Sequence, residues 1–260
     1  MIRSLVNALI ASMIFFPVRP FSARPLDFGL QAEDAWCRTE DGVLLHGWFI
    51  QAQAERPCLL LFHGNADNIS IRLPKAKEWA SRGLSVLLID YRGYGKSGGR
   101  ISSGEDLYRD ARAGLKWLRE KKKLTSAQIV LYGESIGSVP AIRLGTEEPF
   151  KAVILEAPFT SLREMAKIHY GFVPDFFLKD FIMDNESRIS QLKSPVFILH
   201  GTADEIVPIQ MGKRLFAQAP EPKRMFEIQG AHHNDISEVG GQSFFDEPFR
   251  FLAGERTPSF

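Results

Sequence analysis

The chain has 260 residues, of which 45% are hydrophobic and 24% charged, with a formal net charge of +1. This length suits a single α/β domain, and the composition excludes intrinsic disorder. No basic cluster exceeds the three lysines at 121–123, so nucleic acid is not expected as a partner. Cys37 and Cys58 form neither a metal-binding pattern nor a disulfide framework, and we expect neither a metal nor a cofactor.

The first 18 residues have the pattern of an amphipathic helix that Pro17 ends. Its apolar residues recur at helical spacing: Ile2, Leu5, Val6, Leu9, Ile10, Met13 and Ile14. The charge-free stretch 4–18 is shorter than the ~20 residues that span a bilayer. We therefore expect residues 2–18 to associate with a membrane surface. The sequence does not indicate which side of the membrane this is. A short anchor, a signal peptide and docking onto the protein's own surface are alternatives. Residues 1–24 form one segment, and residues 25–260 form the domain.

Strand-like and helix-like stretches alternate along the domain. The sequence predicts eight strands, near residues 35–39, 44–51, 58–62, 85–90, 128–131, 152–155, 196–199 and 223–228. Helices are expected between most of them, for example at 69–81 and 105–121. Such alternation predicts an α/β fold: a mostly parallel sheet with helices on both faces and an antiparallel start.

A Gly-x-Ser-x-Gly turn directly follows the apolar run 129–131. Its glycines, Gly133 and Gly137, would let a strand and a helix pack closely around a strained serine. Ser135 is therefore the candidate nucleophile. The five residues alone also fit an ordinary strand-to-helix turn. A catalytic role for Ser135 therefore requires an acid and a base at other strand ends.

Two later strand ends supply a candidate acid and a candidate base. Their order along the chain, Ser then Asp then His, is the one found where a serine nucleophile occupies such a strand-to-helix turn. Asp204 lies past the strand at 196–199, with Glu205 as its rival. After the strand at 223–228 come His232 and His233, which compete for the role of the base. The remaining histidines are expected to be structural: His46, His63, His169 and His200.

A fourth strand end carries His63-Gly64-Asn65. An amide presented there, with that of the residue after the nucleophile, would stabilise an oxyanion, so the backbone N–H groups of Asn65 and Ile136 are the candidates. The glycine-rich stretch 91–99 fits neither phosphate-binding glycine motif.

Residues 160–192 form no expected strand and are rich in aromatic side chains. We call this segment the cap. The family resemblance described below implies a short lid here, whose apolar wall contacts the substrate, and a helical hairpin that fills its own core is the alternative. The substrate-binding candidates are Phe172, Phe176, Phe177 and Phe181.

Together these motifs resemble those of α/β-hydrolase-fold serine hydrolases, over residues 36–252. The stretches 63–66, 90–97, 132–137 and 201–208 are similar to the small α/β-hydrolase-domain branch that includes protein depalmitoylases and their bacterial relatives. Depalmitoylases of that branch have a cysteine-rich, lipidated N-terminus, whereas this chain has no cysteine before position 37. The resemblance implies an α/β-hydrolase fold with a cap insertion. It favours Asp204 as the acid and the histidine before Asn-Asp, His233, as the base.

The implied activity is hydrolysis of a carboxylic ester or thioester, with an acyl or lipid-like substrate, through an acyl-enzyme intermediate. A serine peptidase of the prolyl-oligopeptidase type and a non-catalytic scaffold are the alternatives. Because the candidate triad lies far downstream, removing residues 1–20 is expected to leave turnover of a short soluble ester nearly unchanged.

Overall fold

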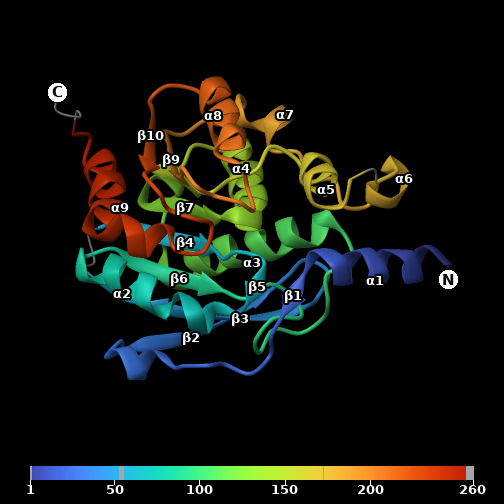
Figure 1. Ribbon diagram of the computed structural model, residues 1–260. Coiled ribbons are helices and arrows are strands. Elements are labelled where there is room, and N and C mark those ends of the chain that lie inside the picture. The colour runs from blue at the N-terminus through green and yellow to red at the C-terminus, as the bar shows by residue number, and fades with distance from the viewer. Residues whose placement is uncertain (1, 53–55, 172, 256–260) are drawn as a thin grey trace.

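The computed structural model describes residues 2–52, 56–171 and 173–255, without the side chains of residues 2–6 and 175. Eight strands form one sheet in the order β10-β9-β8-β7-β4-β6-β3-β2 (Figure 1). Their bounds are β2 Ala32–Arg38, β3 Leu44–Ile50, β4 Cys58–Phe62, β6 Ser85–Ile89, β7 Ile129–Glu134, β8 Ala152–Glu156, β9 Val196–Gly201 and β10 Lys223–Ile228. All pairings are parallel except those of β3 with β2 and β6. The predicted fold class is confirmed, and each expected strand is present.

The sheet is buried on both faces because its central strands are mostly apolar. Successive side chains of a strand point to opposite faces, so Leu59 and Leu61 of β4 join one core while Leu60 and Phe62 join the other. The helices α2 Leu73–Ser81 and α9 Ile236–Leu252 contribute to the first core. The second core contains residues of α3 Gly104–Lys122, α4 Ser138–Glu147 and α8 Ile209–Gln218.

Short 3-10 turns connect several of these elements: η1 Pro25–Phe28, η2 Ile69–Arg72, η3 Ser126–Gln128 and η4 Ser135–Gly137. The helix predicted over 69–81 is in fact η2 followed by α2. Pro74 explains the division, because it has no N–H to donate to the carbonyl of Ser70 in an α-helix.

Both cysteines are buried in strands, Cys37 in β2 and Cys58 in β4. Burial disfavours the thiolate and raises the pKa of each thiol to about 12. Each therefore acts as a small apolar core residue.

The N-terminal helix α1 spans Ile2–Ile14 and lies beside the cap (Figure 1). Ile10 and Ala11 are buried against the domain, whereas Leu9 and Met13 are 65% and 47% exposed. One face of the helix thus docks on the protein, and the exposed apolar side chains lie elsewhere on it. Among the residues that the structure describes, no helix is long and apolar enough to cross a membrane.

A two-stranded sheet that the sequence did not predict follows α1. The strand β1, Phe16–Pro17, pairs in parallel with β5, Ala66–Asp67. A strand of two residues has no periodicity to detect, so only the tertiary structure reveals this pairing.

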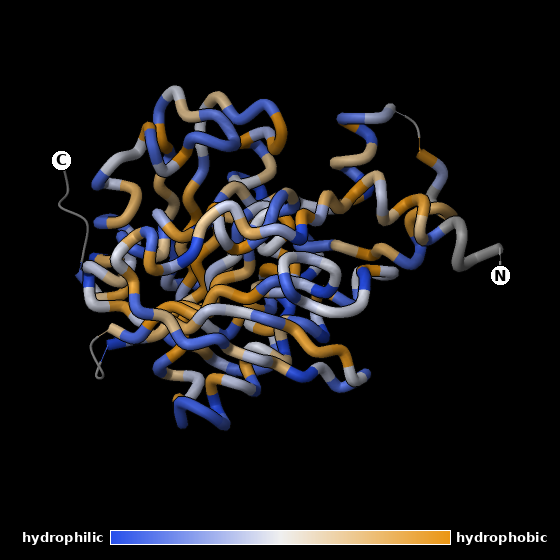
Figure 2. Tube along the Cα trace, turned by 90° about the horizontal axis from the view of Figure 1, so that it is seen from below, coloured by the Kyte–Doolittle hydropathy of each residue, from blue (hydrophilic) through white to orange (hydrophobic). Residues whose placement is uncertain are grey.

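The cap lies between β8 and β9, where it was expected. It contains α5 Leu162–Tyr170, α6 Asp175–Leu178 and α7 Glu186–Ile189, and Figure 1 shows α5 and α6 projecting from the body of the domain. Figure 2 shows apolar residues both in α1 and in the neighbouring cap. Directly after α1, Phe15 faces Phe181 of the cap, and their ring centres lie 6.4 Å apart.

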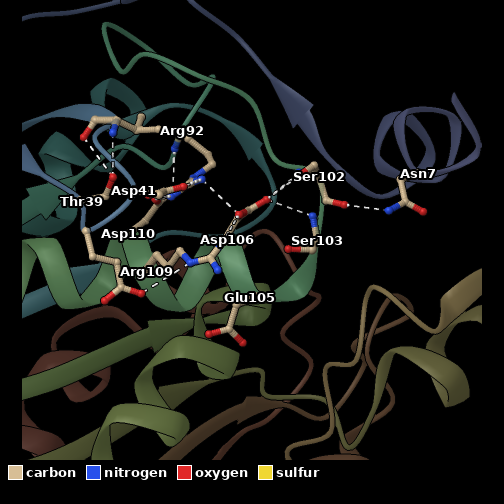
Figure 3. Close-up of polar contacts among 12 residues, drawn as sticks. Asn7, Thr39, Asp41, Arg92, Ser102, Ser103, Glu105, Asp106, Arg109 and Asp110 are labelled. Carbon is tan, nitrogen blue, oxygen red and sulfur yellow. Dashed lines mark hydrogen bonds and ion pairs between the residues drawn. The ribbon is translucent and has the colours of Figure 1, made fainter. Parts of the chain in front are cut away.

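A buried ion cluster ties the loop after β6 to the start of α3 (Figure 3). Arg92 is 4% exposed and lies within 3.0 Å of carboxylate oxygens of Asp41, Asp106 and Asp110. Asp106 also accepts hydrogen bonds from Ser102 and Ser103 and thereby caps the helix. Burial raises the pKa of Asp110 to about 6, against the effect of Arg92.

Replacing Arg92 with methionine would leave Asp106 and Asp110 buried without their main cation. We expect Arg92→Met to lower the free energy of unfolding by about 3–5 kcal/mol at neutral pH. The loss should shrink as the pH falls and Asp110 takes up a proton. Urea unfolding followed by tryptophan fluorescence measures both effects. Arg109→Ala removes a more exposed partner of the same cluster and should cost no more than about 1 kcal/mol. Equal losses in the two variants would contradict the role given to Arg92.

Candidate active site

Ser135 stands at a sharp turn between β7 and α4. Its φ of +51° is in the left-handed region that a residue with a side chain rarely adopts. A Cβ on Gly133 would lie 2.5 Å from the carbonyl oxygen of Gly137, and one on Gly137 would lie 2.1 Å from that of Phe62. Only glycine fits at these two positions, and the close packing forces the strained turn at the serine between them.

A chain of hydrogen bonds joins Ser135 to a histidine and a carboxylate. His233 Nε2 lies 3.2 Å from Ser135 Oγ, and its Nδ1 lies 2.8 Å from Asp204 Oδ2. The other carboxylate oxygen, Asp204 Oδ1, accepts the backbone N–H groups of Ile206 and Val207 at 3.0 and 2.7 Å. These bonds fix the carboxylate, and the carboxylate orients the imidazole toward the serine hydroxyl.

The rival acid and base lie together outside this chain. His232 Nδ1 is 2.9 Å from Glu205 Oε2, and both side chains are more than half exposed. His233 and Asp204 are the pair that the structure brings to Ser135. The four histidines expected to be structural have other partners: His46 bonds to Asp34, His63 to the Gly64 carbonyl, His169 to the Ile206 carbonyl and His200 to the Val207 carbonyl. His200 Nε2 also lies 3.5 Å from Asp204 Oδ2 and so supports the carboxylate of the chain.

The electrostatics favour a charged imidazole beside a charged carboxylate. Burial disfavours the imidazolium, but the hydrogen bond and charge of Asp204, with the charges of Glu134 and Glu156, raise the pKa of His233 above its ordinary value. Burial of Asp204 is likewise outweighed by its hydrogen bonds to His200 and His233, which hold its pKa well below the usual range. Asp204 is therefore ionised across the neutral range.

The loop after β4, residues 63–68, lies next to the serine turn because β4 and β7 are neighbouring parallel strands. Phe62 of β4 lies opposite Gly133 of β7. Asn65 follows Phe62 by three residues and Ser135 follows Gly133 by two, so both lie just past the same ends of these neighbouring strands. We call residues 63–68 the oxyanion loop. The Tyr94 hydroxyl donates to the Asn65 carbonyl at 2.7 Å, and Arg72 Nη1 donates to the Ala66 carbonyl at 3.0 Å. Two side chains thus hold the carbonyl groups of two consecutive residues of the loop, Asn65 and Ala66.

A buried ion network that sequence reasoning missed lies beneath these loops. Arg72 Nη2 is 2.7 Å from Glu134 Oε1, and Lys75 Nζ is 3.3 Å from Glu134 Oε2 and 2.6 Å from Glu156 Oε2. Burial opposes ionisation of Glu134, but the two cations hold its pKa well below the usual range. The available signal was the i, i+3 spacing of Arg72 and Lys75 on an otherwise apolar helix face.

The aromatic cap residues have different environments. Phe172 lies outside the described residues. Phe176 and Phe177 are 63% and 37% exposed, and their ring centres are 4.0 Å apart. Phe181 is fully buried against Phe15, so its contacts belong to the joint between the cap and the N-terminal segment. In the described part of the chain, no group of three or more His, Cys, Asp or Glu side chains is arranged to hold a metal ion.

The sheet order, the strained serine turn and the acid and base on later strand ends define an α/β-hydrolase fold. A family model described as "Serine aminopeptidase, S33" matches residues 53–178. An uncharacterized protein of Mycobacterium tuberculosis is 37% identical over 92% of this chain and 86% of its own. WAV2 of Arabidopsis thaliana, an α/β-hydrolase domain-containing protein, is 31% identical over 96% of this chain and 89% of its own. The bem46 protein of Schizosaccharomyces pombe is 34% identical over 88% and 79%.

The chain therefore belongs to the α/β-hydrolase family that includes these proteins. An esterase from Pyrococcus furiosus has the same fold, with a TM-score of 0.77 and 22% identity over 94% of this chain and 99% of its own.

The raised pKa of His233 predicts the pH dependence of hydrolysis. The histidine must be neutral to accept the serine proton, so kcat/KM should rise with pH with a midpoint above the ordinary histidine value of about 6.5. Rates on a short soluble ester from pH 5 to 9 measure this midpoint. A flat profile, or a midpoint below about 6, would contradict the environment described for His233.

Proposed function

We propose that the protein is a serine hydrolase that cleaves carboxylic esters or thioesters through an acyl-enzyme intermediate. The observation that carries the proposal is the hydrogen-bonded chain from Ser135 through His233 to Asp204 at a strained turn. The likeness to an esterase fold is consistent with it.

The proposed reaction has two stages. Ser135 Oγ attacks the acyl carbon while His233 Nε2 takes the serine proton, and the resulting imidazolium then gives a proton to the leaving alcohol or thiol. Asp204 keeps the imidazole in the required tautomer. The amides of Asn65 and Ile136 stabilise the oxyanion. In the second stage His233 removes a proton from water, which attacks the acyl-enzyme and releases the acid and the serine.

The proposed substrate is an acyl or lipid-like ester or thioester, and the proposed location is a membrane surface. Exposed apolar side chains support both proposals. Leu9 and Met13 of α1 lie close to the cap, because the Tyr170 hydroxyl is 3.4 Å from the Met13 carbonyl. Other exposed apolar residues of this region are Phe16, Ile168, Phe176, Phe177 and Ile182. The resemblance to depalmitoylases places an acyl-protein thioester among the candidates.

A peptidase is the second candidate because of the description of the matching family model. An aminopeptidase needs an anionic group to hold the amine of its substrate. The acids near the triad are already engaged: Glu205 pairs with His232, and Glu134 pairs with Arg72 and Lys75. This favours the esterase proposal, and a peptidyl amide belongs in the substrate panel.

The proposal predicts the effects of three substitutions. A fluorophosphonate should label the wild-type protein but not Ser135→Ala, and ester hydrolysis by that variant should fall by up to about 10⁶-fold. His233→Ala should lose nearly as much, because His233 is the base that is hydrogen-bonded to Ser135 in the described part of the chain. His232→Ala is the matched control and should keep most of the activity, since the exposed imidazole of His232 is paired with Glu205. Labelling that survives in Ser135→Ala, or a larger loss for His232→Ala than for His233→Ala, would overturn the assignment.

The proposed membrane surface predicts a separate result. Leu9→Glu with Met13→Glu should weaken binding to phosphatidylcholine–phosphatidylglycerol vesicles by at least about tenfold, because each large apolar side chain contributes roughly 1.5–3 kcal/mol when fully buried. Vesicle flotation measures the change. Val239→Glu alters an equally exposed residue on α9, on the opposite side of the molecule (Figure 1), and should bind like the wild type. Equal binding by the double variant and the wild type would exclude this surface.

A further inference from the structure

The chain that follows α1 runs along the oxyanion loop. Phe16 and Pro17 pair with Ala66 and Asp67, the two residues directly after Asn65. The Val18 N–H adds a weaker contact to the Asp67 carbonyl at 3.4 Å. We call residues 16–22 the strap. A segment nearly 50 positions away in the sequence is thus hydrogen-bonded to the loop that carries a proposed oxyanion donor.

The side chain of Asn68 fastens the strap to this loop. Asn68 is fully buried, and its Nδ2 donates to the carbonyls of Val18 and Pro20 at 3.0 and 2.9 Å. Its Oδ1 accepts from the N–H and the hydroxyl of Ser70 at 2.9 and 2.6 Å. Both amide hydrogens bind the strap, and the oxygen binds the turn η2 that the loop enters. A buried amide with all these bonds made has one defined orientation.

Further bonds place the strap between two loops. The Val18 carbonyl also accepts the Gly95 N–H at 3.0 Å, from the glycine-rich stretch whose Tyr94 holds Asn65. Ser22 bonds through its N–H and its hydroxyl to the Ser70 hydroxyl at 3.1 and 2.9 Å. The oxyanion loop is therefore fixed by Tyr94 and Arg72 on one side and by the strap on the other.

The helix before the strap is attached differently. Asn7 Nδ2 donates to Asp180 Oδ2 of the cap at 3.0 Å. It also donates to the Ser102 carbonyl at 3.4 Å (Figure 3). A cavity of about 770 Å³ lies between α1 and the loop that contains Arg92 and Ser102. Asn7 thus links α1 to the cap and to this loop, whereas the strap is hydrogen-bonded to the oxyanion loop.

We propose that the strap is a positioning element for the oxyanion hole and that Asn68 is its anchoring residue. This inference rests on the proposed hydrolase function. Asn68 touches no reacting atom in the proposed mechanism; it acts through the backbone that presents the Asn65 amide. A donor that binds the oxyanion acts mainly in the transition state, so its displacement lowers kcat and leaves KM nearly unchanged. The proposal therefore predicts that loss of residues 1–20 lowers turnover of a short soluble ester, in contrast to the expectation from the sequence alone.

Two truncations and two matched asparagine variants test the strap with a short soluble ester. Removing residues 1–14 deletes α1 and keeps the strap, so kcat should stay within about twofold of the full chain. Removing residues 1–22 deletes the strap as well and should lower kcat by about 10–100-fold, because misplacement of catalytic groups by about 1 Å costs up to about 10²-fold. Asn68→Ala should lower kcat by a similar factor with KM within about twofold. Asn7→Ala is the control, since it loses contacts of α1 alone, and should turn over like the wild type.

Titration with a fluorophosphonate counts the active sites that can react, so that kcat can be expressed per reactive site. Thermal unfolding measures the stability of each variant. If titrated sites of the strap variants turn over at the wild-type rate, the proposal is overturned. The proposal is also overturned if fewer sites can be titrated but those that remain turn over at the wild-type rate. The strap would then contribute to folding and not to the position of the oxyanion donor. A full-length chain that neither labels nor hydrolyses any ester would contradict the proposed function instead, before the variants are compared.

Discussion

The whole site depends on how closely β4 approaches the turn after β7. There is no room for a side chain between the Phe62 carbonyl and Gly137, or between Gly133 and the start of α4. This contact forces Ser135 into a left-handed conformation and points its hydroxyl away from the sheet. It also brings the oxyanion loop beside the nucleophile, because that loop continues β4 from the same contact. The order β9-β8-β7 then places the acid loop two strands away, and β10 beside β9 places the base next to the acid.

A buried charge network accompanies this geometry. Two cations, Arg72 and Lys75, and two carboxylates, Glu134 and Glu156, share one region beneath the loops. Buried ions cost several kcal/mol each in desolvation and are tolerated only when paired and hydrogen-bonded. The arrangement has chemical effects as well. Arg72 bridges Glu134 and the Ala66 carbonyl, and the negative charges of Glu134 and Glu156 help to raise the pKa of His233. Stability and site geometry therefore depend on the same four side chains.

Features that have a local sequence pattern could be predicted from the sequence. Strand-like stretches, most of them apolar, identified the eight strands, glycine spacing identified the turn at Ser135, and strand ends placed the loops of Asp204 and His233. The choice of His233 over His232 rested on the family resemblance, because the local pattern alone does not separate the two residues. In the structure His233 is the one that contacts Ser135. Contacts between distant segments left no pattern at all. The pairing of Phe16–Pro17 with Ala66–Asp67 and the bonds of Asn68 could not be predicted, since they depend on where the chain returns after long separations. Phe181 was assigned to a substrate wall by composition alone, whereas packing against Phe15 fixes its position.

The burial of both cysteines has a practical consequence for studies of motion. Thiol reagents react with the thiolate, and Cys37 and Cys58 are inaccessible and hold their protons far above neutral pH. The native chain is thus a nearly silent background for maleimide or methanethiosulfonate chemistry. A single cysteine introduced at an exposed position of α1, such as Leu9, would carry a spin label or fluorophore alone, and a second on α6 would complete a distance pair. The separation of the N-terminal helix from the cap then becomes a directly observable coordinate, without removal of any native residue from the core.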